Sequence, residues 1–519
     1  MKPRVVNSNL LDEVRELYMN GRHSDLLHPD RIKALEQASS PVATEALELR
    51  VFLVSVYLAK RQITLAGQAM DGVVLRNNEP DTALIGKLYS HREAEYLAGY
   101  WKLMVGRYLY YRNRVEDAAR STARASDALK DATKSDLAIL MTAEARTFDA
   151  RLVSQVRNQE AAETIISRNS EALTSRYGMQ PRGGIDSQLA RANARLASFD
   201  WKCGRLERGR HHVYLALYLF TRGIADDIAH GRALLTASRL EATLASNGVA
   251  WQARLLRECK ELFAKHCHPY RFRADAQLAQ SHAKAGELTR AEDILDELEA
   301  QYESEMRSSA NREPMSADAR QLRVAMMDCR LTRIWLSERL NDWDAALRQA
   351  GLLYDEVEAR DDVPLRLIAE AALHHGIALV KTGDVERGRA SILQALARAR
   401  NGAWIAIQIR AHFALAESYD QSNQACLHYD AGATLASTAR ISGYLRELQV
   451  QLGNRLSAHM SFQVRANATL EETVEETKMT YVSMMVNAKL TAKQMEEQAS
   501  VSAAEISRLK RRLKDRGST

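Results

Sequence analysis

Apolar residues recur three and four positions apart through most of the chain, and the pattern is clearest in residues 368–400. Two such segments stand there, separated by the polar residues 382–384. Because this spacing places apolar side chains on one face of an α-helix, the stretch predicts a helix, a tight turn and a second helix. Two antiparallel helices need small residues where their backbones come closest, so we expect Gly376 to face Gly388.

The same pattern recurs on both sides of this stretch, with uneven quality. The other predicted hairpins are Ala43 to Leu75, Tyr96 to Ala128, Leu137 to Leu173, Leu189 to Phe220, Ala229 to Ala264, Ala274 to Gln301, Leu322 to Val357 and Ile405 to Ala436. One hairpin cannot bury its own apolar face, whereas a stack of hairpins buries a continuous core. The pattern therefore predicts about nine stacked helical hairpins.

The best-formed hairpin resembles the tetratricopeptide repeat. The matching positions are Gly376, Gly383, Asp384, Gly388, Ile392 and Ala395, and Ala372 replaces the early Trp of that family. The small residue of the second helix returns every 38 to 55 positions here, compared with a family repeat of ~34. The resemblance implies an α-α superhelical solenoid with unusually long repeats. Long-helix repeats of this kind are similar to those of bacterial regulators, in which the solenoid senses a ligand or partner.

Composition supports an all-α fold. The chain has 519 residues, 24 Gly, 8 Pro and 6% aromatic residues, which leaves few residues that favour strands or turns. This length exceeds the ~250 to 300 residues over which a single core usually grows, as expected for a solenoid. No apolar run reaches the ~18 residues that span a bilayer, and charges interrupt the N-terminal segment, so we expect a cytoplasmic protein without a membrane anchor.

The two ends of the chain differ from the repeats. We expect residues 1–41 to form an N-terminal helical cap, residues 42–446 the solenoid and residues 447–519 a C-terminal helical segment with a basic end. Apolar and small residues in 470–513 fit one heptad register, which predicts a long helix. Ala and Ser at several seam positions leave three alternatives for this helix: a coiled-coil homodimer, docking onto the solenoid, or partial disorder.

Motifs that carry catalysis are missing from the sequence. It contains no phosphate-binding glycine loop, zinc-protease motif, nucleophile elbow or kinase motif. The segment from Lys265 to Tyr270 places two His and one Cys close together, but adjacent helical residues point in different directions, and capping of the helix end before Pro269 is the better interpretation. We therefore expect no enzyme activity, no cofactor and no metal. The five scattered cysteines predict reduced thiols.

Charge is distributed unevenly along the solenoid. Residues 190–273 contain 15 Lys/Arg against 7 Asp/Glu, whereas residues 285–362 contain 10 against 19. A basic block followed by an acidic block suits a charged partner, packing between repeats, or simply solvated helix faces. First helices line the concave face in the tetratricopeptide family, so their polar residues are the candidates for binding a peptide or protein. The candidates are Arg107, Tyr111, Arg191, Asn193, Arg195 and Lys202.

The sequence thus predicts a non-catalytic scaffold or sensor that captures a partner on its concave face and couples capture to assembly or signalling. The alternative is a regulator that contacts nucleic acid through the basic block or the C-terminal helix. The residues that would neutralise phosphates in that helix are Arg508, Lys510, Arg511, Arg512 and Lys514. A solvated, cation-rich helix end explains the same residues without a ligand.

Overall fold

The computed structural model describes most of the chain up to residue 439 and a few short segments beyond it. The described residues are 4–38, 44–77, 79–81, 83–84, 95–112, 114–130, 136–156, 159–177, 183–222, 224–244, 249–310, 317–360, 363–419, 423–439, 448–450, 452–453, 478, 482 and 502–516. The chain forms two compact units, Met1–Ile405 and Ala406–Thr519.

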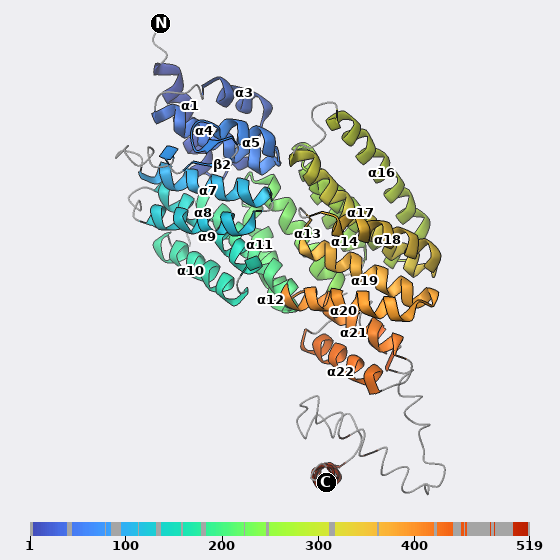
Figure 1. Cartoon of the computed structure of the whole chain (residues 1–519). Helices are drawn as coiled ribbons and strands as arrows, with labels where there is room; N and C mark the ends of the chain where they lie inside the picture. Colours follow the sequence, from blue (N-terminus) through green and yellow to red (C-terminus); the bar gives the residue numbers. More distant parts are fainter. Residues whose placement is uncertain are drawn as a thin grey trace, which may run out of the picture. The chain divides into compact units, whose positions relative to one another are not determined.

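Within the described residues, nine successive helix pairs correspond to the nine predicted hairpins (Figure 1). The first unit contains the pairs α4 (Thr44–Lys60) and α5 (Ile63–Met70), α7 (Glu95–Tyr111) and α8 (Val115–Lys130), α9 (Asp136–Val156) and α10 (Gln159–Tyr177), α11 (Gly183–Lys202) and α12 (Leu206–Phe220), α13 (Asp227–Leu244) and α14 (Val249–Lys265), α15 (Tyr270–Lys284) and α16 (Leu288–Ala310), α17 (Ala317–Arg339) and α18 (Trp343–Glu358), and α19 (Leu365–Thr382) and α20 (Val385–Asn401). The ninth pair, α21 (Ile405–Ser418) and α22 (Asn423–Thr438), lies essentially in the second unit. The prediction of an all-α repeat fold is confirmed.

Three short helices precede these pairs, and a small hairpin interrupts them. The helices are α1 (Arg4–Met19), α2 (His23–Leu26) and α3 (Pro29–Ala38). After α5, strands β1 (Leu75–Arg76) and β2 (Glu79–Pro80) pair antiparallel. The helical periodicity did not predict these strands, because two residues per strand are too few to carry an alternating pattern.

Close approach of two backbones defines the hairpin of α19 and α20. A Cβ atom added to Gly376 would lie 2.8 Å from the Gly388 carbonyl oxygen, and one added to Gly388 would lie 2.8 Å from the Gly376 carbonyl oxygen. The predicted pairing of these two glycines is therefore confirmed. Gly383 ends α19 with a φ of 102°, a left-handed conformation that glycine adopts without steric strain.

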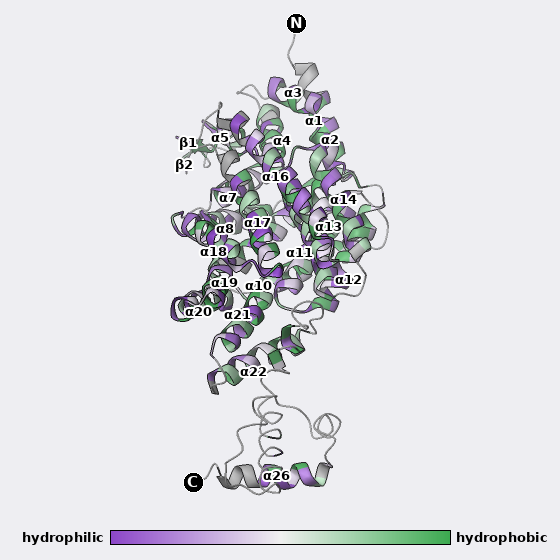
Figure 2. Ribbon diagram, turned by 90° about the vertical axis from the view of Figure 1, so that its right-hand side faces the viewer, coloured by the Kyte–Doolittle hydropathy of each residue, from purple (hydrophilic) through white to green (hydrophobic). Residues whose placement is uncertain are grey.

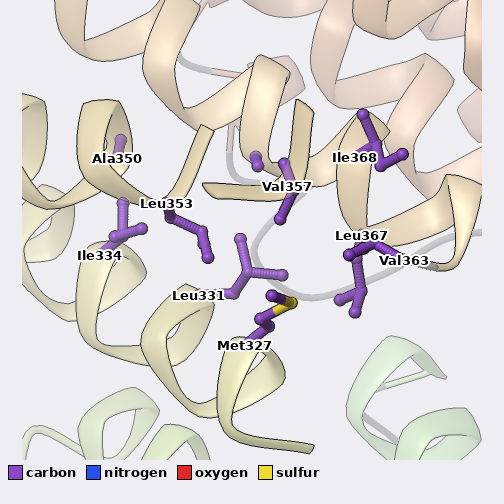
Figure 3. Packing of buried hydrophobic residues seen from close by; sticks show 10 residues of the cluster. Met327, Leu331, Ile334, Ala350, Leu353, Val357, Val363, Leu367 and Ile368 are labelled. Atoms are coloured by element: carbon purple, nitrogen blue, oxygen red, sulfur yellow. The ribbon is translucent and has the colours of Figure 1, made fainter. Parts of the chain in front are cut away.

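Neighbouring hairpins share one core. In the cluster of Figure 3, Leu331 and Ile334 of α17, Leu353 of α18, and Leu367 of α19 are all buried, as is Val363 in the connection between α18 and α19. The helices carry both hydrophobic and hydrophilic residues (Figure 2). Burial of the apolar stripe of each helix against the next hairpin, at ~25 cal/mol per Å² of apolar surface, is what stabilises the stack.

The first unit winds so that distant hairpins meet. Helix α5 contacts α17, and the Nη2 of Arg61 donates a hydrogen bond to the hydroxyl of Tyr270, 209 positions further along the chain. Near the N-terminus, the Oγ of Ser24 accepts a hydrogen bond from the backbone N–H of Asp227 at 2.7 Å. Successive first helices, α4, α7, α9, α11 and α13, contact one another, and Tyr270 at the start of α15 reaches Arg61. We call the side of these helices that carries their shared polar residues the inner face.

The predicted long C-terminal helix lies mostly outside the described residues. Its described end is α26 (Ala503–Arg516), where Ile506 and Leu509 are buried. The Nζ of Lys478 lies 2.6 Å from Oε1 of Glu505. The predicted helix over 470–513 stays a prediction, because the structure describes only residues 478, 482 and 502–513 of it.

Among the described residues, no helix has the length and apolar character needed to cross a bilayer.

Candidate binding surface on the first helices

Polar side chains from the first helices form two distinct layers on the inner face of the first unit. One layer is balanced in charge and is covered by α1 and α2. The second layer begins about one turn further along the chain, extends over about two more turns and contains an excess of cations. We call the first the paired layer, formed by Arg107, Glu144, Arg191 and Asp226. The second is the cationic cluster, formed by Arg61, Arg151, Arg195, Lys202, Arg232 and Arg239.

In the paired layer each cation faces a carboxylate. The Nη1 of Arg107 lies 2.8 Å from Oε1 of Glu144, and the Nε of Arg191 lies 2.7 Å from Oδ2 of Asp226. Burial alone would raise the pKa of Asp226, but Arg191 and His23 outweigh it and lower the pKa to about 2. The pKa of Glu144 is also lowered, because Arg107 and Arg191 outweigh the effect of its burial. Both carboxylates are therefore ionised at neutral pH.

The N-terminal helices cover this paired layer. The hydroxyl of Tyr18 donates a hydrogen bond of 2.5 Å to Glu144, and Gly21 is packed against the backbone of Gly183 at the start of α11. Burial and the nearby Arg191 lower the pKa of His23 to about 4, so its ring is neutral at physiological pH. Helix α1 contacts α4, α9 and α11, and α2 contacts α13. Residues predicted as an N-terminal cap therefore bind to the first helices of four hairpins.

Two tyrosine rings, those of Tyr111 and Tyr270, pack against the cationic cluster. The guanidinium carbon of Arg61 lies 4.1 Å from the ring centroid of Tyr111 and 5.2 Å from that of Tyr270. Burial would raise the pKa of Tyr111, but Arg61 and its neighbouring arginines lower it to about 7. The pKa of Tyr270 is likewise well below its usual value, because the same arginines outweigh burial. These phenols supply the partial negative charge that the cluster otherwise lacks.

Three members of the cluster make no ion pair with any described carboxylate: Arg195, Lys202 and Arg232. Burial and the charges of Arg151 and Arg232 lower the pKa of Arg195 to about 9. Burial and the charges of Arg195, Arg151 and Arg366 lower the pKa of Lys202 to about 8. The Nε atoms of Arg195 and Arg232 are buried without a hydrogen-bond partner. These cations repel one another, and among the described residues only tyrosine phenols, not carboxylates, oppose that repulsion at Arg195 and Arg232.

The far end of the cluster is only partly neutralised. Arg239 lies with its guanidinium carbon 5.4 Å from the ring centroid of Trp201. Burial, Arg273 and Arg366 lower the pKa of Arg239 to about 10, although Asp328 acts in the opposite direction. Asp328 itself forms ion pairs with Arg273 and Arg366. Arg366 also pairs with Glu370 at 2.6 Å. Two carboxylates, Asp328 and Glu370, therefore lie among the three arginines Arg239, Arg273 and Arg366.

The structure distributes the predicted binding residues among several settings. Arg107 and Arg191 belong to the covered paired layer, Tyr111 lies buried beneath Arg61, and Arg195 and Lys202 are half-buried members of the cationic cluster. Asn193 lies elsewhere: its amide bonds to the carbonyl of Leu189 and its Oδ1 is 2.9 Å from Nδ1 of His212, between α11 and α12.

Sequence reasoning missed four members of the cluster, Arg61, Arg151, Arg232 and Arg239. Arg232 and Arg239 stand seven positions apart on a first helix inside the basic block, which was an available signal. Arg61 lies in the turn after α4 with a φ of 66°, and its side chain meets residues more than 200 positions away. No local pattern could have identified it.

The histidine segment before Pro269 contacts both of the helices that it joins. The Nδ1 of His268 accepts a hydrogen bond of 3.1 Å from the backbone N–H of Tyr270, at the start of α15, and its ring stacks on Phe263. His268 therefore caps the following helix, which the sequence did not predict, while Lys265 stands in the last turn of α14 as expected. The Nε2 of His266 lies 3.0 Å from Asp227. In the described part of the chain, no three His, Cys, Asp or Glu side chains are grouped as metal ligands.

The basic residues of the alternative nucleic-acid site all lie in α26. Arg508 and Arg511 are exposed and Lys510 is half-buried, while the side chains of Arg512 and Lys514 lie outside the described set. The Nη2 of Arg508 lies 3.7 Å from Glu505. Among the described side chains of α26, Ile506 and Leu509 are buried, whereas Arg508 and Arg511 are exposed.

No protein-family model and no curated protein matches the sequence. Solved structures resemble it in fold. A Rap protein complexed with competence and sporulation factor matches with a TM-score of 0.51 at 12% identity, over 76% of this chain and 98% of that one. Aspartyl phosphate phosphatase F from Bacillus subtilis matches with a TM-score of 0.44 at 13% identity, over 76% and 95%. A signal-transduction ATPase from Pyrococcus horikoshii with a tetratricopeptide repeat sensor matches with a TM-score of 0.39 at 13% identity, over 75% and 53%. The chain therefore has an α-α superhelical fold of the tetratricopeptide-repeat type.

Proposed function

We propose that this protein is a non-catalytic scaffold or sensor that binds a segment of a peptide or protein partner on the inner face of its first helices. The observation that carries the proposal is the convergence of polar, half-buried side chains from α9, α11 and α13 at the cationic cluster. A folded protein that keeps like charges together without neutralising them loses stability. Such an arrangement is maintained more readily when a ligand supplies the missing charge.

The winding of the first unit suggests how binding is coupled to an output. The hydrogen bond from Arg61 to Tyr270 and the contact of Ser24 with Asp227 join hairpins that are far apart in sequence. A ligand held between these hairpins shifts the equilibrium between more open and more closed conformations of the superhelix. The size of the shift is set by the difference in the ligand's affinity for the two conformations. Assembly through the C-terminal segment, in the cytoplasm, remains the proposed readout.

Site-specific photo-crosslinking tests this function. A photoreactive amino acid replaces Ser198, which lies on α11 between Arg195 and Lys202, and a matched variant carries it at Leu352 on α18, where the side chain is 74% exposed. We expect a covalent adduct with a peptide or protein segment from position 198 and none from position 352. Adducts formed equally at both positions, or at position 352 alone, would contradict the proposal.

The alternative, contact with nucleic acid, has one observation in its favour, since the same cations could neutralise phosphates. Gel-shift and anisotropy assays with single-stranded RNA and duplex DNA at low salt distinguish the two. A measurable affinity with a steep salt dependence would favour nucleic acid over a protein partner.

A further inference from the structure

The cationic cluster is extended along the helices, and this extension constrains its ligand. Arg195 and Lys202 are seven positions apart on α11, and Arg232 and Arg239 are seven positions apart on α13. Seven helical residues span ~10 Å. Helices α11 and α13 contact each other. Arg195 lies near Arg232 and Arg239 lies near Arg366, while Lys202 lies near Arg195 as well as Arg366. The cluster therefore has two cationic levels, separated by about two helical turns.

We infer that the ligand is an acidic peptide segment in extended conformation, with two carboxylate side chains placed about three residues apart. An extended chain advances ~3.3 Å per residue, so three residues match the ~10 Å between the two levels. The guanidinium groups of Arg195 and Arg232 bind one carboxylate, because a planar fork suits two carboxylate oxygens. The ammonium group of Lys202, with Arg239, binds the other.

The surrounding residues explain why a ligand must supply these carboxylates. In the paired layer, Glu144 and Asp226 neutralise the arginines, and α1 and α2 cover them. At the cationic levels Arg195, Lys202 and Arg232 have no ion-pair partner among the described residues, and their side chains are half-buried. Arg107 and Arg191 are half-buried as well, so the two layers differ in charge and not in exposure.

This inference rests on the proposed function and makes it specific. A randomised decapeptide library is displayed on beads, and the labelled full-length protein selects from it. We expect the selected peptides to carry Asp or Glu at two positions separated by two or three residues. The Arg195→Gln variant should lose the preference at one of these positions, and Lys202→Met should lose it at the other, each with a loss of affinity of at least tenfold for a selected peptide.

Arg257→Gln is the matched control, because Arg257 belongs to the same basic block but is exposed on α14. Its selected peptides and affinity should equal those of the unmodified protein. Denaturation midpoints of all three variants confirm that each is folded. Inorganic pyrophosphate and a single-stranded oligonucleotide are tested as competitors, and neither should displace the peptide at micromolar concentration.

Selection of neutral or basic peptides, or an equal loss of affinity in Arg257→Gln, would overturn the inference. If the oligonucleotide displaces the bound peptide at a lower concentration than free peptide does, the cluster is assigned to nucleic acid. Crosslinks from position 198 together with neutral selected peptides would retain the proposed function and reject only the acidic ligand. No crosslinks, no selected peptides and no displacement would reject both.

Discussion

Arg61 and Tyr270 are joined by a hydrogen bond of 3.1 Å, although 209 residues separate them in the chain. Arg61 follows the first helix of the first hairpin, and Tyr270 begins the first helix of the sixth. Their contact places the ends of several first helices around one group of cations. The candidate site is therefore a product of superhelical winding, and no single repeat contains it.

Two glycine substitutions should have opposite effects on the free energy of unfolding, one at the crossing of α19 and α20 and one on α18. Gly376→Ala places a Cβ 2.7 Å from Ile392 and 2.8 Å from the Gly388 carbonyl oxygen, so it should destabilise the first unit by about 1 to 3 kcal/mol through overpacking. Gly351→Ala on α18 meets nothing nearer than 3.9 Å, and it should stabilise by ~0.5 to 1 kcal/mol because Ala favours the helix. Urea denaturation measures both, and equal effects would show that the close approach is unimportant.

Two acidic residues at equivalent turns should differ in importance. Oδ1 of Asp342 accepts a hydrogen bond of 3.0 Å from the backbone N–H of Ala345 and so caps α18. Asp384 precedes α20 but makes no such capping bond. We expect Asp342→Ala to lower the free energy of unfolding by ~1 kcal/mol and Asp384→Ala by less than ~0.5 kcal/mol. A larger loss from Asp384→Ala would contradict the assignment of the cap.

Binding of an acidic peptide should weaken as the pH rises from 7 to 9. Lys202 has a lowered pKa of about 8, so above that pH its ammonium group loses its charge in the free protein. Tyr111, with a pKa of about 7, becomes a phenolate over the same range and repels an anion. Both changes weaken binding as the pH rises. Each lost proton can lower the affinity for the peptide by at most ~10-fold per pH unit.

Calorimetric titrations at pH 6.5, 8 and 9 measure this dependence. Lys202→Met should bind more weakly at pH 6.5 and lose the part of the pH dependence near pH 8, whereas Tyr111→Phe should lose the part near pH 7. An affinity that increases with pH, or that is unchanged in the unmodified protein, is incompatible with a cationic site of this composition.

The sequence predicted the hairpins well because each depends on local signals. Small residues such as Gly376 and Gly388, and the turn at Gly383, determine one hairpin without reference to the rest of the chain. The site was only partly predictable. Arg195 and Lys202 were identified because they lie on a first helix, but the periodicity along α11 could not show that Arg61 comes from another hairpin to join them.

The covering of the paired layer could not be predicted for the same reason. Tyr18 lies in a short N-terminal helix whose sequence shows an apolar face, and that face does not indicate which partner it meets. Its hydroxyl reaches Glu144, 126 positions away. Long-range ion pairs and hydrogen bonds depend on how the hairpins wind, and winding results from the sum of many small packing angles.

Substitution of two arginines on the inner face tests the central claim most directly. Arg195→Met removes a cation that has no ion-pair partner in the described part of the chain, and Arg107→Met removes one that neutralises Glu144. In urea denaturation without ligand, we expect Arg195→Met to stabilise the protein by up to ~1 kcal/mol and Arg107→Met to destabilise it by ~2 to 3 kcal/mol. A clear destabilisation by Arg195→Met would contradict the account, because it would mean that the protein already satisfies this charge and needs no ligand to do so.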